Sequence, residues 1–129
     1  MSFKDAIKSF FVKYATFSAR ASRSEFWYAM LFCWLVSFGL EFLEGLFGLF
    51  PTTETYVLDT LFQLATLIPV IAVSIRRLHD VGRSGWWLLI AFTGIGAIFL
   101  LIWDCTRGEA YDNPWGPDPL ANPGVGWTP

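Results

Sequence analysis

The chain has 129 residues, of which 54% are hydrophobic and 16% are charged, and its formal net charge is −2. Soluble domains carry roughly a quarter of charged residues, and a soluble domain of this size buries only about 60–70% of the surface that its unfolded chain exposes. The composition therefore excludes an ordinary soluble domain, and we expect one domain whose apolar surface is covered largely by lipid.

The first predicted element is an amphipathic helix in which apolar residues recur at helical spacing and lysines lie between them. We expect this helix to lie in the membrane plane with its lysines towards anionic headgroups. The alternative is a helix packed beneath the bundle. The apolar residues are Phe3, Ile7, Phe10, Phe11, Tyr14 and Phe17, and the lysines are Lys4, Lys8 and Lys13.

Three long apolar stretches follow, over residues 26–50, 56–75 and 86–103. About 20 helical residues cross a hydrocarbon core of about 30 Å, and backbone polar groups in lipid must be paired within the helix. The sequence therefore predicts an all-α membrane protein with three transmembrane helices after the amphipathic interfacial helix. We expect residues 1–120 to form a single membrane domain.

The ends of the predicted spans carry helix-terminating signals. Ser22 and Glu25 have the spacing of a capping box, Gly82 is expected to end the second helix, and Ser84 is expected to cap the third. Pro69 is expected to kink the second span.

From Asp104 onward the composition changes, because five of the seven prolines lie in this part of the chain. We expect residues 104–129 to form a polar, irregular tail rich in proline and glycine, which folds back locally on the bundle.

The basic residues predict the orientation. Eight of the nine lysines and arginines lie before the first span or between the second and third, and the loop at residues 51–55 has none. Cytoplasmic loops are enriched in lysine and arginine. We therefore expect the amino terminus and the second loop in the cytoplasm, and the first loop and the tail outside.

Eight polar residues are predicted to gather at the cytoplasmic end. Arg76 and Asp80 share one helix face and are expected to pair, and Arg77 is expected to meet Glu25. Three interpretations stay open: the cluster joins the helix ends, binds a phosphate of an anionic lipid, or docks another protein. Proton or solute handling by His79 is a further alternative. The eight residues are Arg20, Arg23, Glu25, Arg76, Arg77, His79, Asp80 and Arg83.

A second polar group is predicted near the outer side, with Glu41 and Glu44 on the first span and Asp59 and Gln63 on the second. Carboxylates within membranes are candidates for ion or proton pathways. The alternative function is therefore a transporter or channel component, which would need a homo-oligomer because three helices make a poor pore. The simpler interpretation is a solvated helix end lining the bundle.

The sequence predicts no enzyme. It contains a single histidine, and no GxSxG elbow or glycine-rich phosphate loop. We expect no catalytic residue, metal site, cofactor or nucleic-acid partner. Cys33 and Cys105 are expected to be free thiols, because they lie near opposite ends of the predicted bundle.

Three motifs resemble a known family. They are RASRSEFW at residues 20–27, RRLHDVGRSGWW at residues 76–87 and NPWGPDP at residues 113–119. Over roughly Phe10 to Leu120 the chain resembles the bacterial membrane family called domain of unknown function 805. The resemblance implies a bacterial inner-membrane location and a small helical bundle, and it implies no activity.

Three positions differ from the pattern of that family. Ala19 stands where glycine is frequent, Trp115 stands where tyrosine or phenylalanine is usual, and Gly94-Ile95-Gly96 stands where a proline is frequent. The glycine pair raises an alternative for the third span, which would break there and return to the cytoplasmic side as a re-entrant hairpin.

These observations predict a small multi-pass protein of the bacterial inner membrane with a cytoplasmic amino terminus. We expect it to contact the lipid bilayer and to bind an anionic lipid or another membrane protein through its arginine-rich cytoplasmic face. The sequence does not specify its biochemical role.

Overall fold

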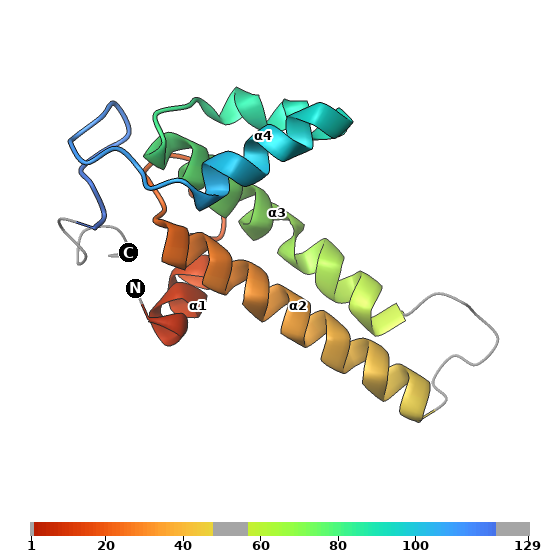
Figure 1. The fold of residues 1–129 in the computed structure, drawn as a ribbon. Helices are drawn as coiled ribbons and strands as arrows, with labels where there is room; N and C mark the ends of the chain where they lie inside the picture. Colours follow the sequence, from red (N-terminus) through yellow and green to blue (C-terminus); the bar gives the residue numbers. More distant parts are fainter. Residues whose placement is uncertain (1, 48–56, 121–129) are drawn as a thin grey trace.

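The computed structural model describes residues 2–47 and 57–120, and every regular element in this part of the chain is a helix. Figure 1 shows two long helices side by side, with a short helix beneath the start of the first and a second helical pair at the same end. In chain order the elements are α1 (Phe3–Val12), α2 (Arg23–Leu46), α3 (Val57–Asp80), the 3₁₀-helix η1 (Gly85–Phe92) and α4 (Gly94–Cys105).

The long helices α2 and α3 form an antiparallel pair of membrane-spanning length. Each has 24 residues, which at 1.5 Å per residue gives about 36 Å and exceeds a hydrocarbon core of about 30 Å. They are the two helices among the described residues that are long and apolar enough to cross a membrane. The expected spans over 26–50 and 56–75 are confirmed as helices within these bounds, while residues 48–56 lie outside the described residues.

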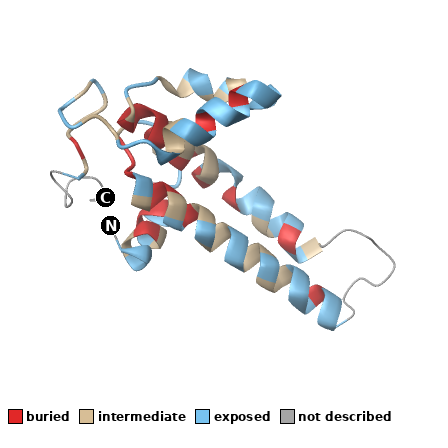
Figure 2. Ribbon diagram, viewed as in Figure 1, coloured by how far each residue is buried: buried red, intermediate tan, exposed pale blue. Residues whose placement is uncertain are grey.

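The outward face of the long pair is apolar. Trp34, Leu35, Phe38 and Phe42 on α2 are all more than half exposed, and Figure 2 shows that most residues along both arms are exposed or half-buried. Because exposed apolar patches of this extent are rare on soluble monomers, lipid is the surrounding that suits this surface. The buried residues concentrate where α2 begins and α3 ends, and we call this the cluster end.

The packed core lies at the cluster end and includes α1. Phe10 of α1 is buried with Phe26 and Ala29 of α2 and Val73 of α3. α1 is therefore a helix as expected, and it packs against α2 through one face while Phe11 stays exposed on another. Its position in the membrane plane stays a prediction.

The start of α2 confirms half of the expected capping box. The Ser22 hydroxyl accepts the Glu25 amide hydrogen at 3.3 Å, which satisfies one of the free donors of the first turn. The Glu25 carboxylate does not return to the Ser22 amide, because it is bonded to Ser9 and Arg76 instead.

The end of α3 confirms Gly82 as the helix stop. Gly82 has φ +78°, its amide donates to the His79 carbonyl at 3.0 Å, and the Arg83 amide donates to the Leu78 carbonyl at 2.9 Å. These two bonds form a Schellman motif, in which glycine tolerates the left-handed conformation. Pro69 lies within α3 and does not end it, since the helix continues to Asp80.

The third apolar stretch is not the single helix that we expected over 86–103. It consists of η1, with 8 residues, and α4, with 12 residues. These give lengths of about 16 Å and 18 Å at the usual rises of 2.0 and 1.5 Å per residue, and neither crosses about 30 Å. Figure 1 shows the two helices doubling back on each other.

The chain breaks at Thr93 and the glycine pair for a steric reason. The Thr93 hydroxyl caps α4 by accepting the Gly96 amide hydrogen at 3.0 Å. A Cβ atom at Gly96 would lie 1.9 Å from the carbonyl oxygen of Ile90, so the turn requires glycine there. The backbone therefore follows the alternative prediction, a break at the glycine pair, and the prediction of one continuous helix is wrong.

The doubled-back helices return the tail to the cluster end. The Trp27 indole donates to the Asp104 carbonyl at 3.0 Å, Arg20 donates to the Tyr111 carbonyl at 2.8 Å, and the Asn113 side chain donates to the His79 carbonyl at 2.9 Å. The described part of the tail is irregular, as expected. The prediction that the tail emerges at the end opposite the amino-terminal segment is wrong.

This arrangement predicts that residues before α2 and after α4 are accessible from one face of the membrane. In a Cys33→Ala background we expect a membrane-impermeant maleimide to label native Cys105, and a cysteine introduced at the exposed Ser18, from the same side. The measurement compares labelling of intact spheroplasts with labelling of inverted vesicles.

A cysteine at Phe47, the exposed residue that follows α2 at the other end of the long pair, is the matched control and should be labelled from the opposite face. Labelling of Cys105 from the same face as position 47 would contradict the arrangement, because it would require a third crossing.

Candidate functional site: a buried arginine–carboxylate cluster

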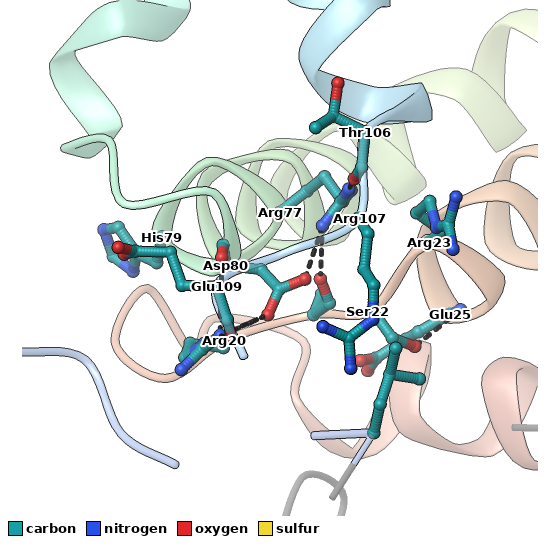
Figure 3. Close-up of polar contacts among 12 residues, drawn as sticks. Arg20, Ser22, Arg23, Glu25, Arg77, His79, Asp80, Thr106, Arg107 and Glu109 are labelled. Carbon is teal, nitrogen blue, oxygen red and sulfur yellow. Dashed lines mark hydrogen bonds and ion pairs between the residues drawn. The ribbon is translucent and has the colours of Figure 1, made fainter. Parts of the chain in front are cut away.

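The sequence-predicted cluster does assemble, at the place where α2 begins, α3 ends and the tail returns (Figure 3). Its central members are almost inaccessible, with exposed fractions between 0% and 2%. Such charges are tolerated only when they are paired and hydrogen-bonded. These five residues, which we call the buried cluster, are Arg20, Glu25, Arg76, Arg77 and Asp80.

One half of the buried cluster joins α3 to α2 and α1. Arg76 Nη1 lies 2.8 Å from Glu25 Oε1, and the Ser9 hydroxyl of α1 donates to the same oxygen. Arg76 Nε and Nη2 are buried and have no partner among the described residues. Burial lowers the pKa of the neighbouring Lys13 ammonium, Glu25 opposes this change, and Arg76 adds to it.

The other half is built on Asp80. Its Oδ1 lies 3.0 Å from Arg20 Nη2, and its Oδ2 lies 2.6 Å from Arg77 Nη1. The expected pairs, Arg76 with Asp80 and Arg77 with Glu25, are therefore wrong. Arg76 faces α1 and α2, whereas Arg77 reaches Asp80 at a separation of three residues, which is also a neighbouring position on a helix.

Arg77 also ends α4. Its Nη2 donates to the Trp103 carbonyl at 3.1 Å and to the Thr106 carbonyl, and its Nε donates to the Asp104 carbonyl at 3.3 Å. A cation at a helix carboxyl terminus satisfies free carbonyls and opposes the helix dipole. Burial raises the pKa of the Asp104 carboxyl to about 6, against the attraction of Arg77.

Arg20 binds the tail. Its Nη1 donates to the carbonyls of Tyr111 and Gly116 at 2.8 and 3.1 Å, and its Nη2 donates to the Glu109 carbonyl at 2.5 Å. A Cβ atom at Gly108 would lie 2.0 Å from an Asp80 carboxylate oxygen. The tail can therefore approach this closely only because residue 108 is glycine.

The His79 side chain contacts the segment before α2 and the tail. Its Nδ1 lies 3.0 Å from the Ala19 carbonyl, and its ring is stacked on Trp115 with centroids 4.5 Å apart and planes 7° apart. Among residues 2–47 and 57–120 no group of three histidine, cysteine or acidic residues could hold a metal ion. These contacts join α3 to the tail.

Two members of the predicted cluster are exposed, Arg23 and Arg83. The Arg83 guanidinium carbon lies 4.5 Å from the centroid of the Trp103 ring and 5.5 Å from that of Trp87. Arg23 Nη1 lies 3.4 Å from the Cys105 carbonyl. Both arginines thus flank the carboxyl-terminal turn of α4.

The predicted carboxylate group lies at the opposite end of the long pair, where α2 ends and α3 begins, and we call this the far end. Glu44 Oε1 accepts the Leu58 amide hydrogen at 2.5 Å, which satisfies a free donor in the first turn of α3. The Gln63 amide donates to Asp59 Oδ2 at 2.7 Å. Glu44 therefore has a structural role, because it caps the first turn of α3.

Sequence reasoning missed Ser9, Lys13, Trp115 and the tail carbonyls as partners of the cluster. The sequence pattern places Lys13 only in an amphipathic helix and gives Ser9 no role, and backbone carbonyls carry no sequence signal. The only available signal was the NPWGPDP run, which contains Trp115 and Gly116.

The observed pairing predicts a strong energetic coupling between Glu25 and Arg76. In a double-mutant cycle with Glu25→Gln and Arg76→Gln, we expect a coupling of about 2–3 kcal/mol in the free energy of unfolding, because each single variant leaves a buried charge unpaired. The measurement is unfolding in detergent followed by tryptophan fluorescence.

The matched control is the cycle between Glu25→Gln and Arg77→Gln, for which we expect a coupling below about 0.5 kcal/mol. Stronger coupling of Glu25 to Arg77 than to Arg76 would restore the pairing first expected from the sequence.

The backbone at Ala19 predicts a stabilising substitution. Ala19 has φ +80°, a conformation that costs an alanine roughly 1–2 kcal/mol. We expect Ala19→Gly to raise the free energy of unfolding by about 0.5–1 kcal/mol after the greater flexibility of unfolded glycine is counted. Ala15→Gly, at an exposed position whose φ is not positive, should instead leave the melting temperature unchanged or lower it.

Comparison with known proteins identifies a family for the chain but no related solved structure. The family model described as "Protein of unknown function (DUF805)" matches residues 14–117. Inner membrane protein YhaI of Escherichia coli (strain K12) is 41% identical over 107 residues, covering 82% of this chain and 87% of that protein. Inner membrane protein YhaH of the same strain is 34% identical over 111 residues, covering 85% and 92%. No solved structure matches the chain. The chain therefore belongs to the DUF805 family, and its relatives are named inner membrane proteins.

Proposed function

We propose that this protein is a non-enzymatic inner-membrane protein whose cluster end lies in the cytoplasm and binds the phosphate groups of anionic lipids. The observation that carries the proposal is the position of Arg83. Its exposed guanidinium lies over two tryptophan rings at the base of a short apolar helical hairpin.

The hairpin of η1 and α4 suits insertion into one leaflet. Its outward residues are strongly apolar and exposed: Leu89, Phe92, Ile95 and Ile98 have exposed fractions of 56%, 89%, 73% and 60%. Each helix is about half as long as a membrane crossing. A re-entrant hairpin would bury this surface in acyl chains and leave its base, with Trp87 and Trp103, at headgroup depth.

The base of the hairpin offers the donors that a lipid phosphate needs. Arg23 and Arg83 are exposed beside the last turn of α4, and the guanidinium fork matches phosphate oxygens. A groove of about 510 Å³ lies between α3 and η1, lined by apolar side chains that include Ile71, Ile75 and Phe92. An acyl chain of the bound lipid would fill this groove.

A lipid suits this surface better than a partner protein. The arginines that would make a strongly positive docking face, Arg20, Arg76 and Arg77, are buried and paired with carboxylates and carbonyls. The exposed arginines lie instead at the apolar boundary, where phosphate headgroups are abundant. The excess of lysine and arginine at this end supports a cytoplasmic location, where anionic lipid attracts basic segments.

The proposal predicts that the protein retains anionic lipid through Arg23 and Arg83. In nanodiscs of phosphatidylethanolamine with a minority of phosphatidylglycerol, native mass spectrometry should detect phosphatidylglycerol enriched around the parent protein. Each of Arg23→Gln and Arg83→Gln should lower this enrichment about fivefold, since a basic residue near an anionic surface contributes about 1 kcal/mol.

Arg107→Gln is the matched control, because Arg107 is exposed but pairs with Asp118 at 3.4 Å, and it should change the enrichment little. Equal enrichment of phosphatidylglycerol around the parent and around a variant that carries both Arg23→Gln and Arg83→Gln would overturn the lipid proposal. Loss of a crosslinked protein partner with unchanged lipid retention would favour the docking alternative instead.

A further inference from the structure

A second groove, of about 390 Å³, lies between α2 and α3 in their apolar arms. Unlike the groove beside η1, it has a partly polar lining. Its residues on α3 follow the spacing i, i+3, i+4 and i+7, which places them along one face of the helix. We call this surface the α2–α3 seam, and its main residues are Trp34 and Ser37 on α2 and Gln63, Thr66, Leu67 and Val70 on α3.

The seam is open to its surroundings at the depth of the hydrocarbon. Trp34 is 60% exposed and Leu67 is 52% exposed, and Gln63 is exposed as well. Gln63 follows Val57, the first residue of α3, by about 9 Å along the helix axis. With α3, about 36 Å long, centred on a core of about 30 Å, the Gln63 amide lies roughly 6 Å inside the core.

The Gln63 amide has hydrogen-bonding groups left over. Among the described residues its side chain makes one hydrogen bond, from Nε2 to Asp59 Oδ2 at 2.7 Å. An amide has two N–H donors and an acceptor oxygen, so the second N–H and the oxygen of Gln63 require a partner from outside the chain. Thr66 has no such need, because its hydroxyl donates to the Phe62 carbonyl at 2.9 Å. An unpaired amide that faces acyl chains is costly.

A second glutamine amide is the complement of the first. Across a two-fold axis, two amides can each donate an N–H to the oxygen of the other, which satisfies the free groups of both. Copies of this chain insert in one orientation, set by its basic residues. A two-fold axis then runs along the membrane normal, and Gln63 lies at the same depth in both copies.

We propose that two copies of this chain associate along their α2–α3 seams, with each Gln63 amide donating to the Gln63 oxygen of the other copy. The two pairs of long helices form a four-helix bundle, and the exposed side chains of Trp34 and Leu67 are covered in it. A lipid fits the seam less well, because an acyl chain has no donor or acceptor for the Gln63 amide. The interface lies apart from the proposed lipid site, whose arginines are at the cluster end.

The first test measures association in liposomes by energy transfer between copies that carry a donor or an acceptor dye on native Cys105, in a Cys33→Ala background. Transfer should rise with the ratio of protein to lipid. We expect Gln63→Leu to raise the ratio at half-maximal transfer about tenfold, because it removes two interhelical hydrogen bonds. If Gln63 faced lipid alone, leucine in its place would leave this ratio unchanged.

Ser74→Ala is the matched control for the loss of a polar group from α3. The Ser74 hydroxyl donates to the Val70 carbonyl at 2.8 Å within its own helix, and Ser74 is not among the residues that line the seam. The ratio of protein to lipid at half-maximal transfer should therefore stay as in the parent. Unfolding followed by tryptophan fluorescence checks that both variants are folded.

The second test keeps Gln63 and locates the interface by oxidative crosslinking in liposomes, with both native cysteines replaced by alanine. Leu67→Cys, one helical turn from Gln63 in the seam, should form a disulfide-linked dimer. Leu61→Cys is its matched control, because Leu61 is similarly exposed, at 57%, and lies on the opposite face of α3 at 3.6 residues per turn. Its crosslinking should be far weaker, since cysteines that point apart cannot be bridged.

Three results would overturn the proposal. The first is energy transfer in the parent that does not rise with the ratio of protein to lipid, which would assign the seam to lipid or to another protein. The second is an unchanged half-maximal ratio in folded Gln63→Leu. The third is crosslinking of Leu61→Cys as strong as that of Leu67→Cys, and this result decides alone if Gln63→Leu is unfolded. None of them bears on the enrichment of phosphatidylglycerol.

Discussion

The fold depends on the buried carboxylate of Asp80, which lies between Arg20 and Arg77. Each arginine uses its remaining donors on backbone carbonyls, Arg20 on the tail and Arg77 on the last turn of α4. One carboxylate at the end of α3 therefore orients two cations. These cations hold the tail and the last turn of α4 at the cluster end, together with the contacts of Trp27, His79 and Asn113. Loss of the carboxylate would leave both guanidinium groups buried and unpaired, which is far more costly than loss of an exposed ion pair.

The Arg76–Glu25 pair completes this arrangement, because it joins α3 to α2 and, through Ser9, to α1. Helices in lipid gain little from the hydrophobic effect between them, so polar contacts and close packing have a larger part in their association. The protein concentrates these contacts at one end. The arms of α2 and α3 beyond it present a broad apolar surface (Figure 2).

The two ends of the long pair consequently have opposite electrostatic character. At the cluster end, arginines neutralise carboxylates inside the protein, and the surplus positive charge is exposed beside tryptophans. At the far end, the carboxyl groups lie in a part of the sequence, residues 24–75, that contains no lysine, arginine or histidine.

The sequence by itself determined the membrane environment, the two long apolar helices, the stop at Gly82 and the charged members of the buried cluster, because these follow from apolar length, local backbone preference and the distribution of charge. It did not determine the pairing, since Glu25 and Asp80 are both within reach of Arg76 and Arg77, and only the packing of α1 and the tail selects between them. It also did not determine the third apolar stretch. Its composition suits a crossing helix, and the close approach of Gly96 to the Ile90 carbonyl, with Arg77 bound at the end of α4, decides for a hairpin that returns the tail to the cluster end.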